Sequence, residues 1–242
     1  MRRITFLITM FFTYLFGMFL LPVALVLGLF DKKLQVQIAY AFNRFIAILS
    51  IKISGAKLEM KGLDHIPKNQ AVLYVGNHRS MFDILLLMKL IRTPLIFVGK
   101  KSVMKWPVIS WWMRAQKTLF IDRDNLREGL KVIIKGIELL KDGDSIVIFP
   151  EGTRSKTDEM LPFKKGSFKL ATKSGVPVIP FAIKGTDDVF ENNKFNLKPK
   201  TIYITVGKPI LLSEVEDTNK DNHTQFIRGI IENMYNEIHN QN

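Results

Sequence analysis

The segment Ala71–Asp83, AVLYVGNHRSMFD, changes character at its midpoint, where an apolar and largely β-branched run gives way to a polar cluster. The same order recurs at Ser145–Ser155, which reads SIVIFPEGTRS. A buried strand delivers functional groups in this way to the loop at its carboxyl end. The two segments therefore predict two buried strands and a site formed by the loops that follow them.

His78 and Asp83 in the first loop form a candidate acid–base pair. They are five residues apart, so a continuous helix would turn them about 140° away from each other. Ser80 provides a bend, because Ser-x-x-Asp before the apolar run Ile84–Leu87 is a capping box that predicts a helix start at Ser80. Asp83 then reaches back to His78, fixes its tautomer and leaves the other nitrogen as a general base. The simpler alternative is that Asp83 only caps the helix and His78 only ends a strand.

The second loop, Pro150–Ser155, is rich in hydrogen-bond donors. Gly152 lets the backbone approach a ligand closely, and Arg154 offers a planar fork that matches phosphate oxygens. Downstream, Lys164 and Lys165 stand just before a predicted helix, whose first amides favour anions. The loop is therefore either an anion site or a basic surface loop.

Four blocks of this sequence resemble the motifs of one known family, the glycerolipid acyltransferases. The blocks are Asn77–Asp83 (NHRSMFD, like the His-x4-Asp motif), Leu119–Arg123 (LFIDR), Phe149–Ser155 (FPEGTRS, intact) and Val176–Phe181 (VPVIPF), and they come in the expected order. The resemblance extends from Lys57 to Pro209 and is greatest to the bacterial 1-acyl-sn-glycerol-3-phosphate acyltransferases.

The resemblance implies an acyl transfer to lysophosphatidic acid that forms phosphatidic acid. His78 would take the proton of the free 2-hydroxyl as that oxygen attacks an acyl thioester, and Asp83 would orient the imidazole. The implied substrate-binding residues are Lys100, Arg123, Glu151, Gly152, Thr153 and Arg154. Among them the three cations would hold the acceptor phosphate, and Glu151 and Gly152 would shape the acceptor pocket. No metal and no cofactor are expected besides the co-substrate, which is acyl-coenzyme A or acyl-acyl carrier protein.

One departure from the family pattern keeps other acceptors open. Lys117 stands where the second block usually opens with Gly. Glycerol 3-phosphate, another lysophospholipid or a lyso-aminolipid are therefore alternative acceptors. A non-catalytic adaptor that binds anionic lipid is an alternative of a different class, and the intact His78 and Asp83 pair argues against it.

Composition and charge limit the kinds of partner that the protein is expected to have. The 242 residues contain no cysteine, which excludes disulfides, thiolate catalysis and cysteine metal sites. A net charge of +13 predicts an anionic partner, either nucleic acid or a membrane surface. Ile4–Phe30 decides between them, because these 27 uncharged residues would span about 40 Å as a helix, more than the roughly 30 Å of bilayer hydrocarbon. We therefore expect a lipid bilayer and no nucleic acid as partner.

Residues 1–54 are expected to anchor the chain in a membrane, and residues 55–242 to form the catalytic domain. A signal peptide is the alternative for the first apolar run, but the run is too long and no cleavage site closes it before Asp31. Pro22 allows a kink that would divide this run into two helices. Leu34–Ser54 predicts a helix on the membrane surface or, alternatively, a core helix of the domain. We expect the cell inner membrane, with the catalytic domain facing the cytoplasm.

Seven apolar segments predict strands, and helical patterns separate several of them. The strand segments are Lys57–Lys61, Ala71–Val75, Leu95–Val98, Thr118–Ile121, Ser145–Phe149, Val178–Ile183 and Thr201–Val206. The helical segments are Ser80–Ile91, Trp106–Ala115, Asn125–Lys141 with Asp124 as its cap, Gly166–Lys173 and Thr224–His239. This alternation predicts an α/β domain with a mixed, largely parallel sheet flanked by helices, and a site at one edge of the sheet.

Overall fold

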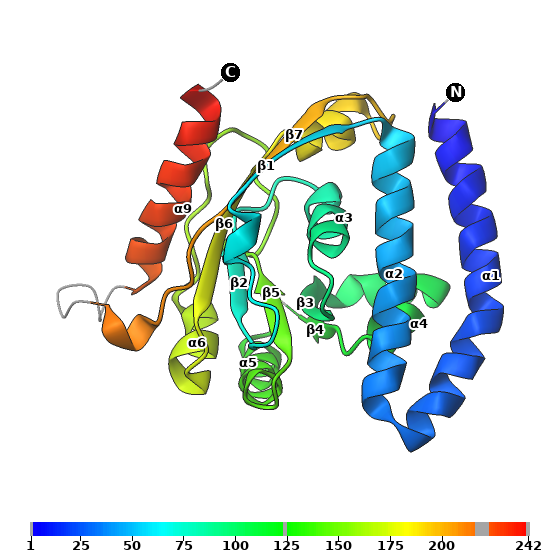
Figure 1. Cartoon of the computed structure of the whole chain (residues 1–242), viewed down its shortest axis with the longest axis horizontal. Coiled ribbons are helices and arrows are strands. Elements are labelled where there is room, and N and C mark those ends of the chain that lie inside the picture. Colours follow the sequence, from blue (N-terminus) through cyan, green and yellow to red (C-terminus); the bar gives the residue numbers. More distant parts are fainter. Residues whose placement is uncertain (1, 123–124, 216–222, 241–242) are drawn as a thin grey trace.

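A seven-stranded sheet lies at the centre of the molecule, in the order β1-β7-β6-β2-β5-β3-β4 (Figure 1). The computed structural model describes residues 2–122, 125–215 and 223–240. The strands are β1 (Lys57–Lys61), β2 (Leu73–Gly76), β3 (Leu95–Lys100), β4 (Leu119–Ile121), β5 (Ser145–Ile148), β6 (Val178–Lys184) and β7 (Thr201–Val206). All neighbouring strands are parallel except β6 and β7. The predicted mixed, largely parallel sheet is therefore confirmed, with every predicted strand present.

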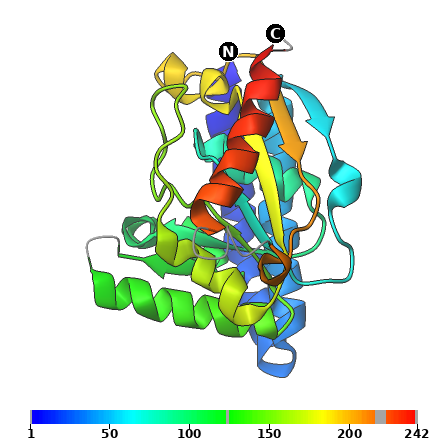
Figure 2. The same cartoon turned by 90° about the vertical axis from the view of Figure 1, so that its left-hand side faces the viewer.

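Helices cover both faces of this sheet (Figure 2). The regular helices that follow the first strand are α3 (Met81–Leu90), α4 (Pro107–Ala115), α5 (Leu126–Lys141), α6 (Lys169–Ser174), α7 (Thr186–Val189) and α9 (His223–Asn240). The 3-10 turns are η1 (Leu63–His65), η2 (Lys101–Lys105), η3 (Lys165–Phe168), η4 (Glu191–Asn193) and η5 (Leu212–Glu214). The helices α3, α4, α5 and α9 match their predicted ranges closely, whereas α7 is not predicted by the sequence pattern.

Two helix starts differ from the prediction. The helix predicted from Gly166 begins as the 3-10 turn η3, and regular helix starts only at Lys169, because Gly and Ser are weak helix formers. At the start of α5, Asn125 is the cap, since its side chain accepts from the backbone N–H groups of Arg127 and Glu128. Asp124, the predicted cap, lies outside the described residues.

The central strands are buried on both sides. Every residue of β2 and β5 is buried, and successive side chains of β2 point to opposite faces. Tyr74 belongs to an apolar cluster with side chains of α3, and Leu73 and Val75 belong to a second cluster with side chains of α5, α6 and α9. The loops at the carboxyl ends of these strands therefore rest on a rigid base.

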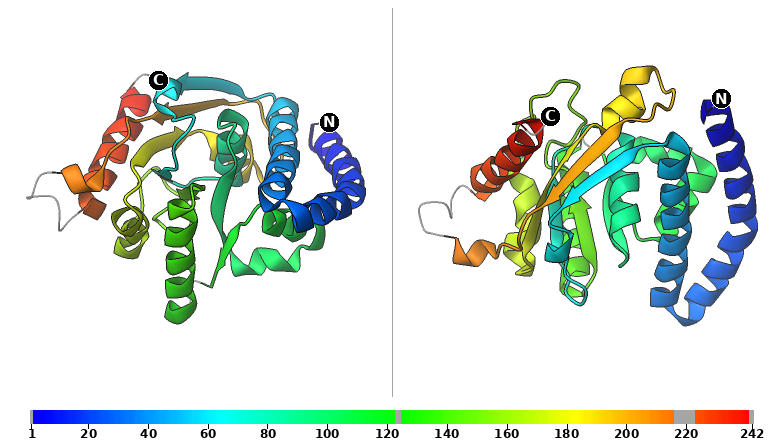
Figure 3. Two further views of the ribbon diagram at one scale, coloured as in Figure 1. Left: turned by 60° about the horizontal axis from the view of Figure 1, so that its bottom comes forward. Right: turned by 45° about the horizontal axis from the view of Figure 1, so that its top comes forward.

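Two long antiparallel helices form an N-terminal hairpin beside this domain (Figures 1 and 3). They are α1 (Arg2–Phe30) and α2 (Lys32–Ser54), and α1 is a single helix in which Pro22 makes no division. Asp31 accepts hydrogen bonds from the backbone of Lys33 and Leu34 and so starts α2. Each helix is long and apolar enough to cross a membrane, but only 17% of the most apolar part of α1 is buried against 44% of that of α2. The α1 helix is therefore the more exposed of the two.

One face of α2 belongs to the core of the domain. Tyr40, Ala47 and Ile51 pack into the same apolar cluster as α3, and the Tyr40 hydroxyl donates to the carbonyl oxygen of Ile91 at 2.8 Å. Its other side carries the exposed Phe45. One face of α2 is therefore a core face, as the alternative prediction had it. The division of the chain into an anchor and a catalytic domain at residue 54 stays a prediction.

Candidate active site

The loops after β2 and β5 lie next to each other because the two strands are parallel neighbours. The loop after β2 continues into α3 through Ser80, whose side chain accepts from the backbone N–H of Phe82 at 2.9 Å. Asp83 completes the capping box by accepting from the backbone N–H of Ser80, also at 2.9 Å. The predicted helix start at Ser80 is therefore confirmed.

His78 and Asp83 meet across this helix start. The imidazole Nδ1 lies 2.8 Å from Asp83 Oδ2, although the residues are five apart in the sequence. An ionised carboxylate only accepts hydrogen bonds, so Nδ1 carries the proton and Nε2 has a free lone pair. Within the described ranges no other group bonds to Nε2, and the side chain of His78 is 13% exposed. The geometry is that of a general base held by an orienting carboxylate.

Asp83 is fixed by more than its histidine. It is fully buried, and its Oδ2 also accepts from the backbone N–H of Arg79 at 2.7 Å. Its Oδ1 accepts from the hydroxyl of Thr186 at 2.6 Å. A carboxylate with this many donors keeps a single orientation, and it therefore also fixes the orientation of the imidazole bonded to it.

The loop after β5 holds His78 from the other side. The backbone N–H of His78 donates to Glu151 Oε1 at 2.6 Å, and its carbonyl accepts from the backbone N–H of Ser155 at 2.9 Å. Phe149 stacks on the imidazole with ring centroids 4.0 Å apart and planes 16° from parallel. The two loops predicted to form one site are therefore joined at His78.

Glu151 of the loop after β5 contacts the loop after β2. Its carboxylate is buried and bonds to two backbone N–H groups, those of His78 and of Leu161. Burial raises the pKa of Glu151, and the two N–H donors work against that rise. Its contacts indicate that Glu151 ties the two loops together.

The cationic residues lie at the surface. Arg154 has a side chain that is 43% exposed, and its Nη1 donates to Glu191 Oε1 at 2.7 Å. Lys100 is exposed at the carboxyl end of β3, on the same edge of the sheet as His78, and Thr153 is exposed beside Arg154. Arg123 lies outside the described residues. The structure thus brings Arg154 to the site and leaves Lys100 as a neighbour on the same edge.

Gly152 and Lys117 both occupy left-handed backbone. Gly152 has φ +72°, a conformation that strains any residue with a Cβ, and a Cβ there would also displace the flexible end of the Lys164 side chain. Lys117 has φ +65°, which is the conformation that the Gly usual at this position in the family adopts without strain. Its Nζ donates to Asp144 Oδ2 at 2.8 Å. The loop before β4 therefore keeps its turn despite the substitution.

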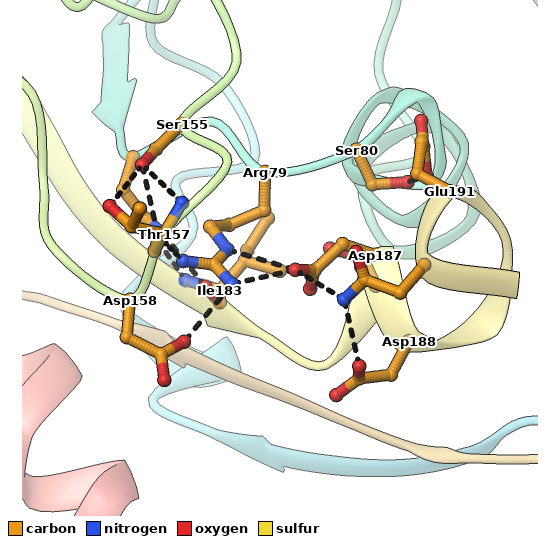
Figure 4. Close-up of polar contacts among 12 residues, drawn as sticks. Arg79, Ser80, Ser155, Thr157, Asp158, Ile183, Asp187, Asp188 and Glu191 are labelled. Atoms are coloured by element: carbon orange, nitrogen blue, oxygen red, sulfur yellow. Dashed lines mark hydrogen bonds and ion pairs between the residues drawn. The ribbon is translucent and has the colours of Figure 1, made fainter.

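Asn77 and Arg79 make contacts at the site that were not predicted from the sequence. Asn77 exchanges two hydrogen bonds of 2.8 Å with the backbone of Ile183 and so extends the pairing of β2 with β6. Arg79 is buried and forms an ion pair with Asp187 at 2.6 Å, and Figure 4 shows its guanidinium between Asp187 and Asp158. Asn77 and Arg79 belong to the NHRS block, so the resemblance to the family motif could have indicated that they are functional. Nothing in the sequence indicated their partners on β6 and α7.

A base of this kind beside an arginine-bearing loop equips an enzyme to deprotonate a hydroxyl and transfer a group to it. A family model described as acyltransferase matches residues 57–184, which is more than half of the chain. The chain belongs to this acyltransferase family.

Relatives and a solved structure agree with the family. A 1-acyl-sn-glycerol-3-phosphate acyltransferase of Borreliella burgdorferi is 29% identical over 195 residues, which are 81% of this chain and 78% of that protein. A chloroplast enzyme of the same name from Brassica napus is 34% identical over 180 residues, 72% of this chain and 52% of that longer protein. The crystal structure of a 1-acyl-sn-glycerophosphate acyltransferase from Thermotoga maritima matches with a TM-score of 0.78 at 23% identity, over 98% of both chains. The fold prediction is therefore confirmed over the hairpin as well as the sheet.

Proposed function

We propose that this acyltransferase transfers an acyl chain from an acyl thioester to the 2-hydroxyl of lysophosphatidic acid, forming phosphatidic acid. The names of its relatives support the acceptor. The observation that carries the chemistry is the 2.8 Å contact of His78 Nδ1 with Asp83, which leaves Nε2 to accept a proton.

In the proposed mechanism, His78 Nε2 removes the proton of the 2-hydroxyl while the hydroxyl oxygen attacks the thioester carbonyl carbon. Asp83 stabilises the resulting imidazolium through Nδ1–H. The tetrahedral intermediate collapses with cleavage of the carbon–sulfur bond, and the imidazolium returns its proton to the leaving thiolate. No covalent enzyme intermediate is needed, because the acyl group passes directly from sulfur to oxygen.

The loops around His78 supply the remaining proposed roles. Arg154 and Arg123 bind the acceptor phosphate with help from Lys100, because guanidinium groups form charge-assisted bonds to phosphate oxygens. Glu151 and Gly152 shape the acceptor pocket, with Glu151 fixing the backbone of His78, and Thr153 also lines the acceptor. The donor is acyl-coenzyme A or acyl-acyl carrier protein, and both are anionic partners that suit the net charge of +13.

We propose that residues 1–54 anchor the enzyme in the cell inner membrane, with the catalytic domain of residues 55–242 facing the cytoplasm. The exposed apolar surface of α1 supports insertion into lipid. Insertion is insensitive to salt, whereas attraction of basic residues is screened beyond ~10 Å at 0.1 M salt. High-salt washing should therefore leave the full-length protein on membranes and release a variant that starts at Asp31. Equal retention of both would mean that α1 is not the anchor.

The activity is tested by incubating the purified protein with acyl thioesters and a panel of lysolipids. We expect phosphatidic acid and one equivalent of free thiol from lysophosphatidic acid, and neither product with the His78→Ala variant. If the enzyme preferred glycerol 3-phosphate or a lyso-aminolipid, that compound would be the acceptor in place of lysophosphatidic acid. Binding to anionic vesicles without thioester turnover on any acceptor would favour the adaptor.

A further inference from the structure

The chain segment that follows β6 supplies side chains to the catalytic turn. It runs from Thr186 to Glu191 and comprises α7, Phe190 and the first residue of η4. The match to the family ends two residues before it, at residue 184. Gly185 makes the course of this segment possible with φ +84°, since a Cβ there would lie 2.4 Å from the carbonyl oxygen of Thr201. The chain therefore turns sharply out of the sheet and passes beside His78 and Asp83.

Thr186 supports the carboxylate that orients His78. Its hydroxyl is buried and donates to Asp83 Oδ1 at 2.6 Å, while Oδ2 takes His78 and two backbone N–H groups. Thr186 is the one donor to Oδ1 in the part of the chain that the structure describes. Its hydroxyl therefore sets the rotation of the carboxylate and takes up part of the negative charge that would otherwise act on the imidazole.

Glu191 connects the start of α3 to the cationic loop. Its Oε2 accepts from Ser80 Oγ at 2.5 Å, and its Oε1 accepts from the backbone N–H of Met81 at 2.9 Å. The same Oε1 accepts from Arg154 Nη1 at 2.7 Å. Arg154 is thus held beside the turn that carries His78, with its other donors facing solvent.

Asp187 holds the segment between these two contacts in place. It forms the buried ion pair with Arg79, whose guanidinium also donates to Asp158 and to the carbonyl oxygen of Thr157 (Figure 4). Removing a partner of such a pair would leave a buried charge uncompensated. The ion pair therefore fixes the segment Thr186–Glu191 against the turn that carries His78.

We propose that Thr186 and Glu191 are positioning residues of acyl transfer, with Thr186 acting on the rate through Asp83 and Glu191 acting on acceptor binding through Arg154. The inference rests on the proposed function only for the acceptor. The role of Thr186 concerns His78 and Asp83 themselves, so it has a readout that needs no acceptor.

The first test follows the Nδ1–H proton of His78 by NMR in the full-length protein in micelles, assigned as the resonance absent from His78→Ala. Thr186→Val keeps the shape and removes the donor, so Asp83 becomes a stronger acceptor for Nδ1–H and this proton should resonate further downfield. Thr186→Ser should restore the wild-type shift. Arg79 and Glu151, which also contact the pair, are unchanged in every variant.

A matched control for this test is Thr172→Val, which removes an α6 hydroxyl that donates to the carbonyl oxygen of Phe168. Its His78 Nδ1–H resonance should lie where that of the wild type lies. In acyl transfer, Thr186→Val should lower kcat by roughly tenfold, as expected from the loss of one hydrogen bond to a charged group. A His78 Nδ1–H resonance at the same shift in Thr186→Val and wild type would overturn the role of Thr186, whatever the acceptor is.

The second test measures KM for lysophosphatidic acid in Glu191→Gln. The amide oxygen of Gln can still accept from Met81, and its NH2 group can donate to Ser80 Oγ. The negative charge that holds Arg154 is lost, so KM should rise about fivefold to tenfold with kcat nearly kept. Glu138→Gln, which breaks an exposed pair with Lys135 on α5, is the control and should leave KM unchanged. An unchanged KM in Glu191→Gln would overturn its role, whereas absence of wild-type turnover on this acceptor would overturn the proposed function.

Discussion

The two halves of the proposed site are built in opposite ways. In the acid–base half, the side chains of His78 and Asp83 are 13% and 0% exposed, and Asp83 takes donors on both oxygens. In the cationic half, Arg154 is 43% exposed and has one described partner, Glu191. Proton transfer needs a fixed geometry, because small misplacements of a base are costly. Phosphate binding instead needs cations that a solvated ligand can reach, so the exposed half can remain adjustable.

This difference predicts that substitutions in the buried half lower the rate or the stability, and that substitutions in the exposed half weaken binding.

The largest effect is expected for His78→Ala. Loss of a positioned base typically costs ~10²–10⁴ in rate, and Asp83→Asn should be severely but less completely impaired. The rate of thiol release from the acyl thioester with saturating acceptor measures both. His65→Ala is the matched control, because His65 contacts the carbonyl oxygen of Val206 and not the acid–base pair. Near-normal activity in a folded His78→Ala protein would contradict the mechanism.

The next largest effect is on stability, in Arg79→Ala. Burial alone would lower the pKa of Arg79, but the hydrogen bonds and charge of Asp187 outweigh burial and raise it, so the arginine stays charged. Its removal leaves Asp187 buried without a counter-charge, with only the neutral donor Asn192 described beside it, and should lower the free energy of unfolding by about 3–5 kcal/mol. Urea unfolding in micelles, followed by tryptophan fluorescence, measures this.

The control for Arg79→Ala is Lys131→Ala, which removes an exposed pair with Glu128 and should cost less than about 1 kcal/mol. If the two variants lost equal stability, the Arg79–Asp187 pair would not stabilise the buried half. The proposed difference between a rigid buried half and an adjustable exposed half would then be contradicted.

A smaller effect is expected for Arg154→Ala in the exposed half. A charge-assisted bond to phosphate contributes about 1.5–3 kcal/mol, and solvent exposure favours the lower limit, so KM for lysophosphatidic acid should rise roughly tenfold with kcat little changed. Lys156→Ala removes the same charge from an exposed position two residues away and serves as the control. A selective fall in kcat would mean that Arg154 supports the chemistry and not acceptor binding.

The sequence predicted those parts of the molecule that depend on local patterns. Apolar runs located all seven strands, and the Ser80 to Asp83 spacing located both the start of α3 and the meeting of Asp83 with His78. The supporting contacts were not predictable, because Thr186 lies 103 residues from Asp83 and α7 is too short for any periodicity. Glu151 shows a related limit, since its motif indicates a functional residue but not the direction in which the carboxylate points.

The smallest effect tests a position remote from both halves. Lys117 and Asp144 precede β4 and β5, at the amino ends of these strands, whereas His78 follows the carboxyl end of the parallel strand β2. The side chain of Lys117 thus points to the end of the sheet opposite the site. Substitution there should leave KM for each acceptor unchanged, even though the family usually has Gly at this position.

Stability should nevertheless respond to the backbone of Lys117, which has φ +65°. Both Lys117→Gly and Lys117→Ala lose the pair with Asp144, but only Gly adopts left-handed backbone without a Cβ clash that costs roughly 1–2 kcal/mol. The greater freedom of Gly in the unfolded chain offsets part of this gain, so Lys117→Gly should be about 1 kcal/mol more stable than Lys117→Ala, or ~2–4 °C in Tm for a chain of this size. Thermal unfolding of the two variants measures the difference, and an Ala variant as stable as the Gly variant would show that this turn is not strained. A change in acceptor preference in either variant would instead mean that substitutions at the amino end of the sheet affect the site. Acceptor preference would then depend on more than the acid–base half and the cationic half.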